Sequence, residues 1–310
     1  MASPAMRREG DMTQQASHDA NTQHARYMRC ACVAHRIRRA RHRVVAYLAA
    51  LTLGVVPALA GCGQLQVSTV TGTPEGPTIA IGVAADEPGM GYWHDGGYSG
   101  FEVDVATYVA KQLGYSSKQI IFKQVRPSTR ARMLAESTVD MVVAGYGMNG
   151  GQEENEADFA GPYLTVGRDL LIRDDDADEI GHVADMSGRA ACVVDPDAAQ
   201  ALAVAAPGVQ VQERDSYPQC VTALMIGEAD AVAADDAVLS GLIEDKGNGY
   251  LSLVGDQYGE VDYGIAVKDG NAQLAGKISA ALDKMRDDGT YATLLDRMRE
   301  ETGFAGPATR

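Results

Sequence analysis

The sequence predicts an α/β protein with two small parallel-sheet units in one chain. Short apolar, β-rich runs alternate with segments of helical periodicity, and the alternation starts again after an acidic turn at residues 174–178. Strands that alternate with helices are typical of parallel sheets covered by helices. At 310 residues and 45% hydrophobic composition, the chain can bury the cores of one or two domains.

The first unit begins with a strand over residues 78–84 and a helix over 101–114, which has one apolar face and ends at a glycine. A strand (120–125), a helix (130–138) and a third strand (139–146) complete it. In the second unit we expect strands at 189–194, 209–214 and 230–235 and helices at 220–228 and 237–245. A strand at 262–268 and a helix at 272–289 follow.

The N-terminal segment has the order of a secretory signal. Five arginines within residues 35–43 directly precede a seventeen-residue apolar run, Val44–Ala60, which ends in small residues. The run is shorter than the roughly 20 residues of a usual transmembrane helix. Leu59–Cys62 resembles the lipobox of bacterial lipoproteins, which predicts cleavage and lipidation at Cys62; the alternative is an N-terminal membrane anchor. Both place the rest of the chain outside the cytoplasm. We expect an extension and signal peptide over residues 1–61 and a flexible tether over 62–77.

Charge and residue counts exclude several classes of function. Beyond residue 61 the chain has 18 basic and 39 acidic residues, a net charge of −21, which disfavours nucleic acid as a partner. Cys192 and Cys220 remain there, and two cysteines in an exported domain more often form a disulfide than a metal site. His94 and His182 are the histidines left. We therefore expect no metal, no cofactor and no enzymatic activity, since no catalytic motif is present.

Several motifs in a fixed order carry a family resemblance. They are GVAADEPGMGYW (82–93), YSGFEVDVATYVAKQLGY (98–115), MLAESTVDMVVAGY (133–146), ADFAGPYLTVGRDLLIR (157–173), MSGRAACVV (186–194), YPQCVTALMIGEADAVAADDAVLSG (217–241) and DYGIAVKDG (262–270). From about residue 78 to residue 298 the chain resembles the family 3 solute-binding proteins of bacterial ABC importers, in particular the glutamate and polar amino-acid branch.

The resemblance implies a two-lobed periplasmic-binding-protein-like fold of type II, with two parallel-sheet lobes joined by a two-strand hinge. Lobe one would comprise residues 78–168 and 261–310, and lobe two residues 169–260. A ligand would bind in the cleft between the lobes, and closure would signal occupancy to a membrane permease. It also implies a disulfide between Cys192 and Cys220 in lobe two.

The part of the family site that holds the ligand's α-carboxylate is altered in this chain. Relatives carry hydroxyls and then an arginine after the third strand; these positions fall here on Gly145, Gly147 and Asn149, and on Gln152 or Glu153. Asp195–Asp197 replaces a Gly-Ser-Thr turn at a helix N-terminus. Arg130 is the nearest substitute anchor, although a structural role in lobe one is the simpler interpretation.

The part of the site that would face the ligand's amino group is retained. The resemblance predicts a ligand-binding set of Asp86, Tyr92, Trp93, Gly145, Tyr146, Gly147, Asn149, Glu153, Asp197 and Asp235, in which Asp235 holds the ammonium group. Simpler roles compete: Asp235 can cap the helix that follows, Tyr92 and Trp93 can pack within a lobe, and the acidic pair at 153–154 can lie on the surface. For Arg168 and Arg173, solvent exposure is the default expectation.

These observations predict a lipid-anchored, extracytoplasmic substrate-binding subunit of a glutamate- or glutamine-type amino-acid ABC importer. If the acids at 153, 195, 197 and 235 line the cleft, a cationic or uncharged ligand fits better than an acidic one. The alternatives are a sensor or scaffold lipoprotein without high-affinity amino-acid binding and, with less support, a dehydratase-like enzyme.

Overall fold

The first lobe is built on three parallel strands. The computed structural model describes residues 77–148, 157–247 and 249–307. Strand β1 (Ile79–Val83) lies between β5 (Ile120–Gln124) and β6 (Met141–Val143) and pairs with both in parallel. A small antiparallel sheet follows β1 along the chain and is made of β2 (Asp86–Glu87), β3 (Gly91–His94) and β4 (Gly97–Ser99).

Helices from both ends of the described chain cover this sheet. They are α2 (Phe101–Gln112), the short α3 (Arg130–Ala135), α7 (Ala272–Asp287) and α8 (Thr290–Thr302), with a 3₁₀ turn η1 (Ser117–Gln119). Helix α2 buries Phe101, Val105 and Val109 in the same apolar core as β1, α7 and α8. The predicted amphipathic face of residues 101–114 is therefore the face that packs.

The second lobe repeats the arrangement with its own parallel strands. Strand β8 (Ala190–Val193) pairs in parallel with β9 (Gln210–Glu213) and β10 (Ala231–Asp235). Its other elements are α4 (Pro196–Ala205), α5 (Tyr217–Met225), α6 (Asp236–Leu242), the π-helical turn η5 (Ile243–Gly247), β11 (Leu251–Leu253) and the 3₁₀ turns η3 (Asp174–Asp176) and η4 (Val183–Met186). Helices α5 and α6 contribute to one apolar cluster and α4 to another.

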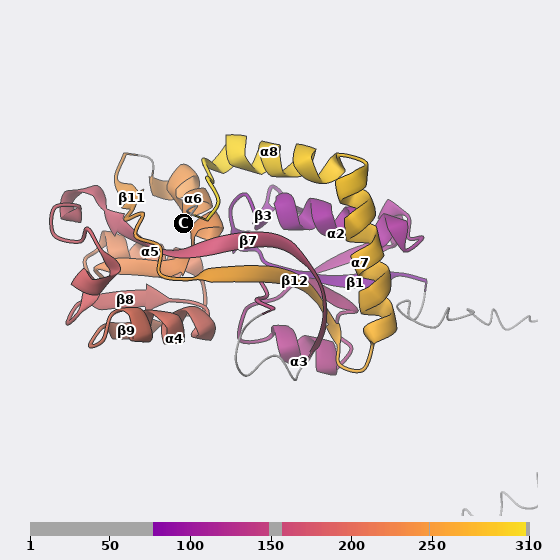
Figure 1. The fold of residues 1–310 in the computed structure, drawn as a ribbon, viewed down its shortest axis with the longest axis horizontal. Coiled ribbons are helices and arrows are strands. Elements are labelled where there is room, and N and C mark those ends of the chain that lie inside the picture. The colour runs from indigo at the N-terminus through magenta and orange to yellow at the C-terminus, as the bar shows by residue number, and fades with distance from the viewer. Residues whose placement is uncertain (1–76, 149–156, 248, 308–310) are drawn as a thin grey trace, which may run out of the picture. The chain divides into compact units, whose positions relative to one another are not determined.

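Two long antiparallel strands connect the lobes. Strand β7 (Ala157–Arg173) pairs through its first part with β12 (Glu260–Lys268) and through its last residues with β10 and β11. Strand β12 also pairs with β6. The order of the described sheet is therefore β5-β1-β6-β12-β7-β10-β8-β9. Figure 1 shows β7 and β12 side by side between the two groups of parallel strands. The prediction of two parallel-sheet lobes joined by two strands is confirmed.

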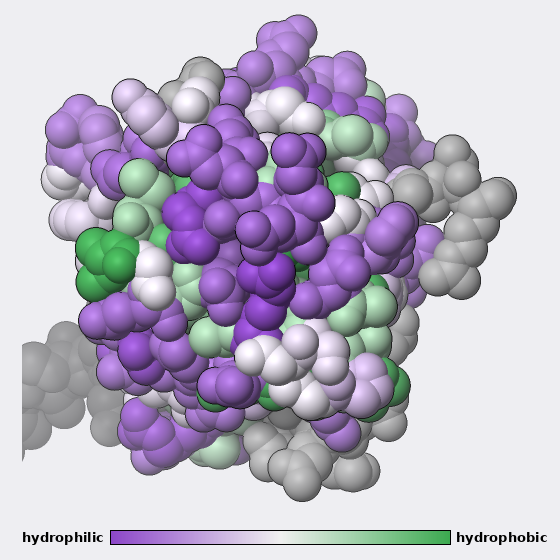
Figure 2. Space-filling view, turned by 90° about the vertical axis from the view of Figure 1, so that its left-hand side faces the viewer, coloured by the Kyte–Doolittle hydropathy of each residue, from purple (hydrophilic) through white to green (hydrophobic). Residues whose placement is uncertain are grey.

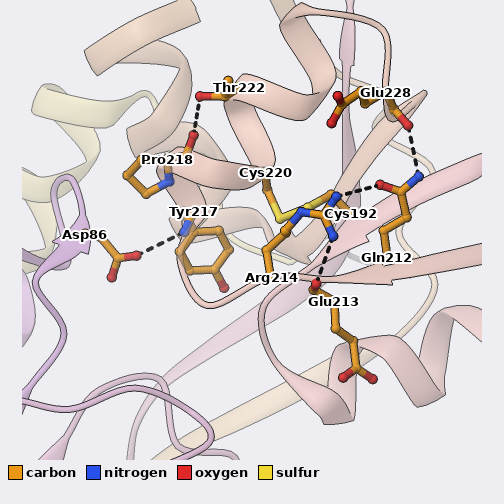
Figure 3. Close-up of a disulfide and its surroundings, with 10 residues drawn as sticks. All are labelled: Asp86, Cys192, Gln212, Glu213, Arg214, Tyr217, Pro218, Cys220, Thr222 and Glu228. Carbon is orange, nitrogen blue, oxygen red and sulfur yellow. Dashed lines mark hydrogen bonds between the residues drawn. A yellow bond between two sulfur atoms is a disulfide. The ribbon is translucent and has the colours of Figure 1, made fainter.

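A disulfide fastens α5 to β8 in the second lobe, as Figure 3 shows. Cys192 and Cys220 are both fully buried and lie 28 residues apart in sequence. Closing a loop of this length restricts the unfolded chain and is worth about 3 to 4 kcal/mol in the chain-entropy model. The predicted disulfide is confirmed.

The predicted lobe boundaries fall within the connecting strands: residues 168 and 169 lie inside β7, and residues 260 and 261 begin β12. The extension, the signal peptide, Cys62 and all but the last residue of the tether lie outside the described residues. Within the described ranges, no helix has the length and apolar character needed to cross a membrane. Figure 2 shows the outer end of the second lobe, which is mainly hydrophilic with small, separate hydrophobic spots.

Candidate interlobe binding site

A cavity of about 480 Å³ lies where the carboxyl ends of β6 and β10 and the start of α4 meet the connecting strands. Gly145 and Gly147 line it from the first lobe, Asp195 and Asp197 from α4, and Asp235 from the end of β10. Ligands of open α/β sheets bind outside the carboxyl ends of strands, so the topology itself places a site here. The cavity size is ordinary for a small-molecule site.

Asp235 is positioned by β10, where it is the last strand residue. Its Oδ2 accepts a 2.5 Å hydrogen bond from the Tyr263 hydroxyl, and its Oδ1 lies 3.7 Å from Nε of Arg168. Both Oδ1 and that Nε are buried and have no hydrogen-bond partner among the described residues. Burial raises the pKa of Asp235 to about 6, opposed by the Tyr263 hydrogen bond and the Arg168 charge. Asp235 occupies the N-cap position of α6, as the simpler interpretation expected, but its side chain makes no cap hydrogen bond to the helix.

The expectation that Arg168 and Arg173 are solvent-exposed is also wrong. Their side chains are 18% and 25% exposed. Arg168 faces Asp235 because β7 and β10 pair at these two residues. Arg173 donates to the Leu224 and Ala229 carbonyls and pairs with Asp176 at 2.6 Å. Both arginines lie on β7, which pairs with β10 and β11, and the packing around this strand leaves their side chains only partly exposed.

Arg130 is the first residue of α3, and its side chain reaches from the first lobe to the second. Its side chain is only 2% exposed, and its Nη1 donates to Asp195 Oδ2 at 3.1 Å. Its Nη2 lies 3.9 Å from Asp197 Oδ2, and its guanidinium carbon lies 4.0 Å from the centre of the Tyr146 ring. Arg130 therefore binds carboxylates that the protein itself supplies, beyond the structural role in lobe one that the sequence favoured.

Asp195 serves this ion pair and α4 at once. It is the N-cap of α4, and its Oδ1 accepts a 2.9 Å hydrogen bond from the amide of Asp197. The Asp197 carboxyl has a raised pKa, first because of burial and then because of the neighbouring Asp195 charge; Arg130 and Arg168 oppose the shift. The start of α4 thus carries two carboxylates directed at a cation of the other lobe.

Two buried acids near the cleft were not predicted from the sequence. Glu102 on α2 is fully buried, and its Oε1 accepts hydrogen bonds from the Gly145 amide at 2.7 Å and the Tyr163 hydroxyl at 2.5 Å. Glu87 is 6% exposed, and burial followed by the charge of Glu102 raises its pKa well above the usual value. Glu102 holds the glycine turn that lines the cavity. Its one signal in sequence is its place beside Phe101 at the start of an amphipathic helix.

The structure divides the predicted ligand-binding set. Gly145, Gly147, Asp197 and Asp235 line the cavity, and Tyr146 lies beneath the Arg130 guanidinium. The backbone of Gly145 has φ 53°, a conformation that a serine or threonine there would adopt only with strain. The hydroxyl-bearing residue that the family resemblance places here would therefore be strained in this backbone.

The other members of the set lie elsewhere. Asp86 and Tyr92 line a separate hollow of about 350 Å³ against α5, and Trp93 is half exposed and packs on Tyr98. Asp86 accepts a 3.0 Å hydrogen bond from the amide of Tyr217, a contact between the lobes that Figure 3 shows. Asn149 and Glu153 lie outside the described residues.

Comparison with known proteins matches the chain to one family. The model of the bacterial extracellular solute-binding proteins, family 3, matches residues 79–300. The chain belongs to this family. The glutamate-binding protein GluB of Corynebacterium efficiens is 32% identical over 268 residues, which cover 82% of this chain and 90% of that protein. The glutamine-binding protein GlnH of Bacillus subtilis is 29% identical over 82% of this chain and 96% of that protein.

Solved structures show the same fold. An ancestral arginine-binding protein bound to glutamine superposes with a TM-score of 0.67 at 29% identity and covers 72% of this chain and 98% of its own. Family members are extracellular solute-binding proteins and in general not enzymes. In the described part of this chain, no group of three or more histidine, cysteine or acidic side chains is arranged to hold a metal ion.

Proposed function

We propose that this family 3 protein is the lipid-anchored, extracytoplasmic substrate-binding subunit of an ABC importer, and that it binds an amino acid or a related amine in the interlobe cavity. One observation carries the choice of ligand group. Asp235 lines the cavity with a carboxylate whose Oδ1 has no hydrogen-bond partner among the described residues and lies 3.7 Å from Arg168. An entering ammonium group would complete this loose pair with a charge-assisted hydrogen bond.

The composition of the cavity lining supports a ligand that brings positive charge. Asp195, Asp197, Asp235 and Glu260 contribute four carboxyl groups, against the single cation Arg168 among the described lining residues. The carboxylate anchor that the family resemblance implies is degenerate, because the lining has glycines at 145 and 147 and Arg130 is engaged by Asp195. The names of the relatives include glutamate, glutamine and arginine, which supports amino-acid-like solutes as a class.

Anchoring by a lipid on Cys62 is part of the proposal and rests on the lipobox-like residues 59–62. Membrane-derived wild-type protein should partition into the detergent phase of a Triton X-114 extraction. The Cys62→Ser variant should lose this partitioning if lipid provides the attachment. Equal partitioning of both forms would favour the apolar run as a permanent anchor.

The role of Asp235 is tested by calorimetry on the mature protein with amino acids and amines. Asp235→Asn keeps an acceptor for the Tyr263 hydroxyl but removes the charge, and should weaken ligand binding by more than tenfold. Asp287→Asn is the control, because it removes one acidic charge at an exposed position of α7. Equal affinity of Asp235→Asn and Asp287→Asn would remove Asp235 from the site.

A second function, that of a sensor or scaffold lipoprotein without high-affinity binding, has one observation in its favour. The lobes contact each other through Arg130 and Asp195, and through Asp86 and the Tyr217 amide, with protein groups alone. If these contacts alone hold the two lobes together, closure of the cleft needs no ligand. Absence of any thermal shift across amino acids, amines and small peptides would favour this function, because a ligand at a hundredfold excess over its Kd stabilises by about 2.7 kcal/mol.

A further inference from the structure

The described part of the cleft contains a pair of groups suited to bind an anion. One is the Arg130 guanidinium, which lies over the Tyr146 ring and is almost completely buried. The other is the N-terminus of the ten-residue helix α4, whose first amide donor is that of Asp197, because Pro196 has no N–H. A guanidinium facing a helix N-terminus would hold the carboxylate of an incoming molecule well.

Asp195 already binds both groups. Its Oδ2 lies 3.1 Å from Nη1 of Arg130, and its Oδ1 accepts a hydrogen bond from the Asp197 amide at 2.9 Å. Asp197 adds a second carboxylate 3.9 Å from the same guanidinium. The side chains of Arg130, Asp195 and Asp197 are 2%, 19% and 25% exposed, so solvent screens these contacts weakly. The Asp195 carboxylate thus occupies the place between Arg130 and the N-terminus of α4 where an anion would bind.

A ligand carboxylate would meet two obstacles in this arrangement. It would have to displace Asp195 from Arg130, and the largely buried Asp195 carboxylate would then lose its cationic partner, which is destabilising. It would also lie close to the displaced Asp195 and to Asp197, whose like charges repel it. Since both obstacles concern the carboxylate alone, they do not affect a molecule that carries only an amine.

The rest of the cavity wall suits such a molecule. Asp235 and Glu260 offer carboxylates, while Ala198, Ala201 and Val204 along α4 offer aliphatic surface. We propose that Asp195 acts as a built-in carboxylate in the anion-binding part of the cleft, so that this protein selects aliphatic amines without a carboxylate, such as alkyl diamines. This specificity rests on the proposed function of the same cavity as a solute site, and makes Asp195 its specificity-determining residue.

The test compares molecules that differ only by the carboxylate. Calorimetry on the mature wild-type protein would use three pairs: cadaverine and lysine, putrescine and ornithine, and agmatine and arginine. We expect at least one amine to bind ten times or more tightly than its amino acid. In Asp195→Asn, which keeps the capping oxygen but removes the nearer of the two carboxylates that pair with Arg130, we expect the preference within that pair to fall by at least tenfold. Asp287→Asn should keep the wild-type preference.

The outcomes separate this proposal from the function on which it rests. An amino acid that binds as tightly as or more tightly than its amine would overturn the selection of amines and leave the solute-binding function standing. Unchanged preference in a folded Asp195→Asn would remove Asp195 from specificity. If Asp195→Asn does not fold, Asp195→Ser keeps a capping hydroxyl and carries the same test. No binding by either member of all three pairs would overturn the selection of these amines, whereas the proposed function itself fails only if the wider thermal-shift screen of amino acids, amines and small peptides is also silent.

Discussion

Two adjacent acids at the end of β10 have different surroundings, one in the cavity and one within the protein. Asp235 faces the cavity, whereas the next residue, Asp236, accepts hydrogen bonds from the Gly167 amide at 3.1 Å and from Gln257 at 2.8 Å. Burial raises the pKa of both, to about 6 for Asp235 and about 7 for Asp236. Asp236 holds the connecting strand β7 to α6, which leaves Asp235 as the acid of this pair that a ligand can reach.

The pKa of Asp235 predicts that amine binding weakens in acid. An ammonium group stabilises the ionised carboxylate, so binding releases the proton that the empty site holds below a pH of about 6. At pH 5 only about a tenth of the empty sites are ionised, and the Kd should be roughly tenfold higher than at pH 7.5. Calorimetry at both pH values, in buffers of different ionisation enthalpy, measures the affinity and the released proton.

Asp235→Asn should lose this proton release. A wild-type Kd that is equal at pH 5 and pH 7.5 would show that the bound ligand does not depend on the charge of Asp235.

The sequence indicated a role in the site for Asp235, but it did not indicate which acids Arg130 and Arg168 would contact. Asp235 was assigned to the site because the family resemblance places an aspartate at the end of this strand, and it lines the cavity. The roles of Arg130 and Arg168 could not be predicted in the same way. Whether an arginine faces solvent or an acid of another lobe depends on pairings such as Arg168 opposite Asp235, which join residues far apart in the chain.

At the scale of elements, α6 makes an unusually close approach to the first lobe. A Cβ added to Gly241 would lie 1.8 Å from the carbonyl oxygen of Pro88 and 2.8 Å from its carbonyl carbon. Pro88 immediately follows β2, so the contact joins α6 to the end of the strand that carries Asp86 and Glu87. Helix α6 follows Asp235 directly, and this contact therefore helps to set the separation of the two lobes next to the candidate site.

Gly241→Ala should lower stability, although alanine normally favours a helix. Exchanging glycine for alanine within a helix stabilises by roughly 0.5 to 1 kcal/mol when space is available. At Gly241 the methyl group meets backbone, and overpacking of this kind costs typically about 1 to 3 kcal/mol. Thermal unfolding should show a lower Tm than that of the wild type. Gly276→Ala in α7 is the matched control, because nothing lies within 4 Å of its added Cβ.

The control should raise the Tm. If both alanine variants raise it, α6 can move away from Pro88 at no cost, and the contact does not set the separation of the lobes.

Helix prediction from periodicity was most accurate where the buried face is wide, although the short α3, which buries two residues, was expected as well. Helix α2 buries seven residues, and its pattern predicted it almost to the residue. Helices α4 and α8 bury two residues each, Ala198 and Leu202 in one and Met298 and Thr302 in the other. A helix that lies on the surface with so narrow a buried stripe leaves little periodic signal, and neither was among the helices expected from periodicity.

At the scale of the whole molecule, the alternation of strands and helices predicted two parallel-sheet units and the family resemblance implied the two-strand hinge, but neither predicted which residues share the cleft. Asp86 and Asp235 both lie near the ends of buried strands and both were assigned to one ligand. The structure places them in different hollows, with the contact between Asp86 and Tyr217 joining the lobes. Which strand-end residues share a cavity depends on how closely the lobes approach, and contacts such as Gly241 against Pro88 decide that.

The charge of the whole chain predicts that amine binding depends on salt. Beyond residue 61 the chain has a net charge of −21, and the acids of the cavity add a local negative field that attracts cations. Salt screens this field over a Debye length of about 10 Å at 0.1 M. Raising NaCl from about 20 to about 300 mM shortens the Debye length. The cavity acids then attract the ligand less strongly, and cadaverine binding should weaken several-fold.

The matched ligand is 5-amino-1-pentanol, which has the same carbon chain but one ammonium group. Its affinity should fall with salt about half as steeply, because screening acts on each ligand charge. Equal slopes for the two ligands would mean that the second ammonium group of cadaverine gains nothing from the acids of the cavity. In that case Asp235 would be the one acid that recognises charge, and the ligand would be a monoamine.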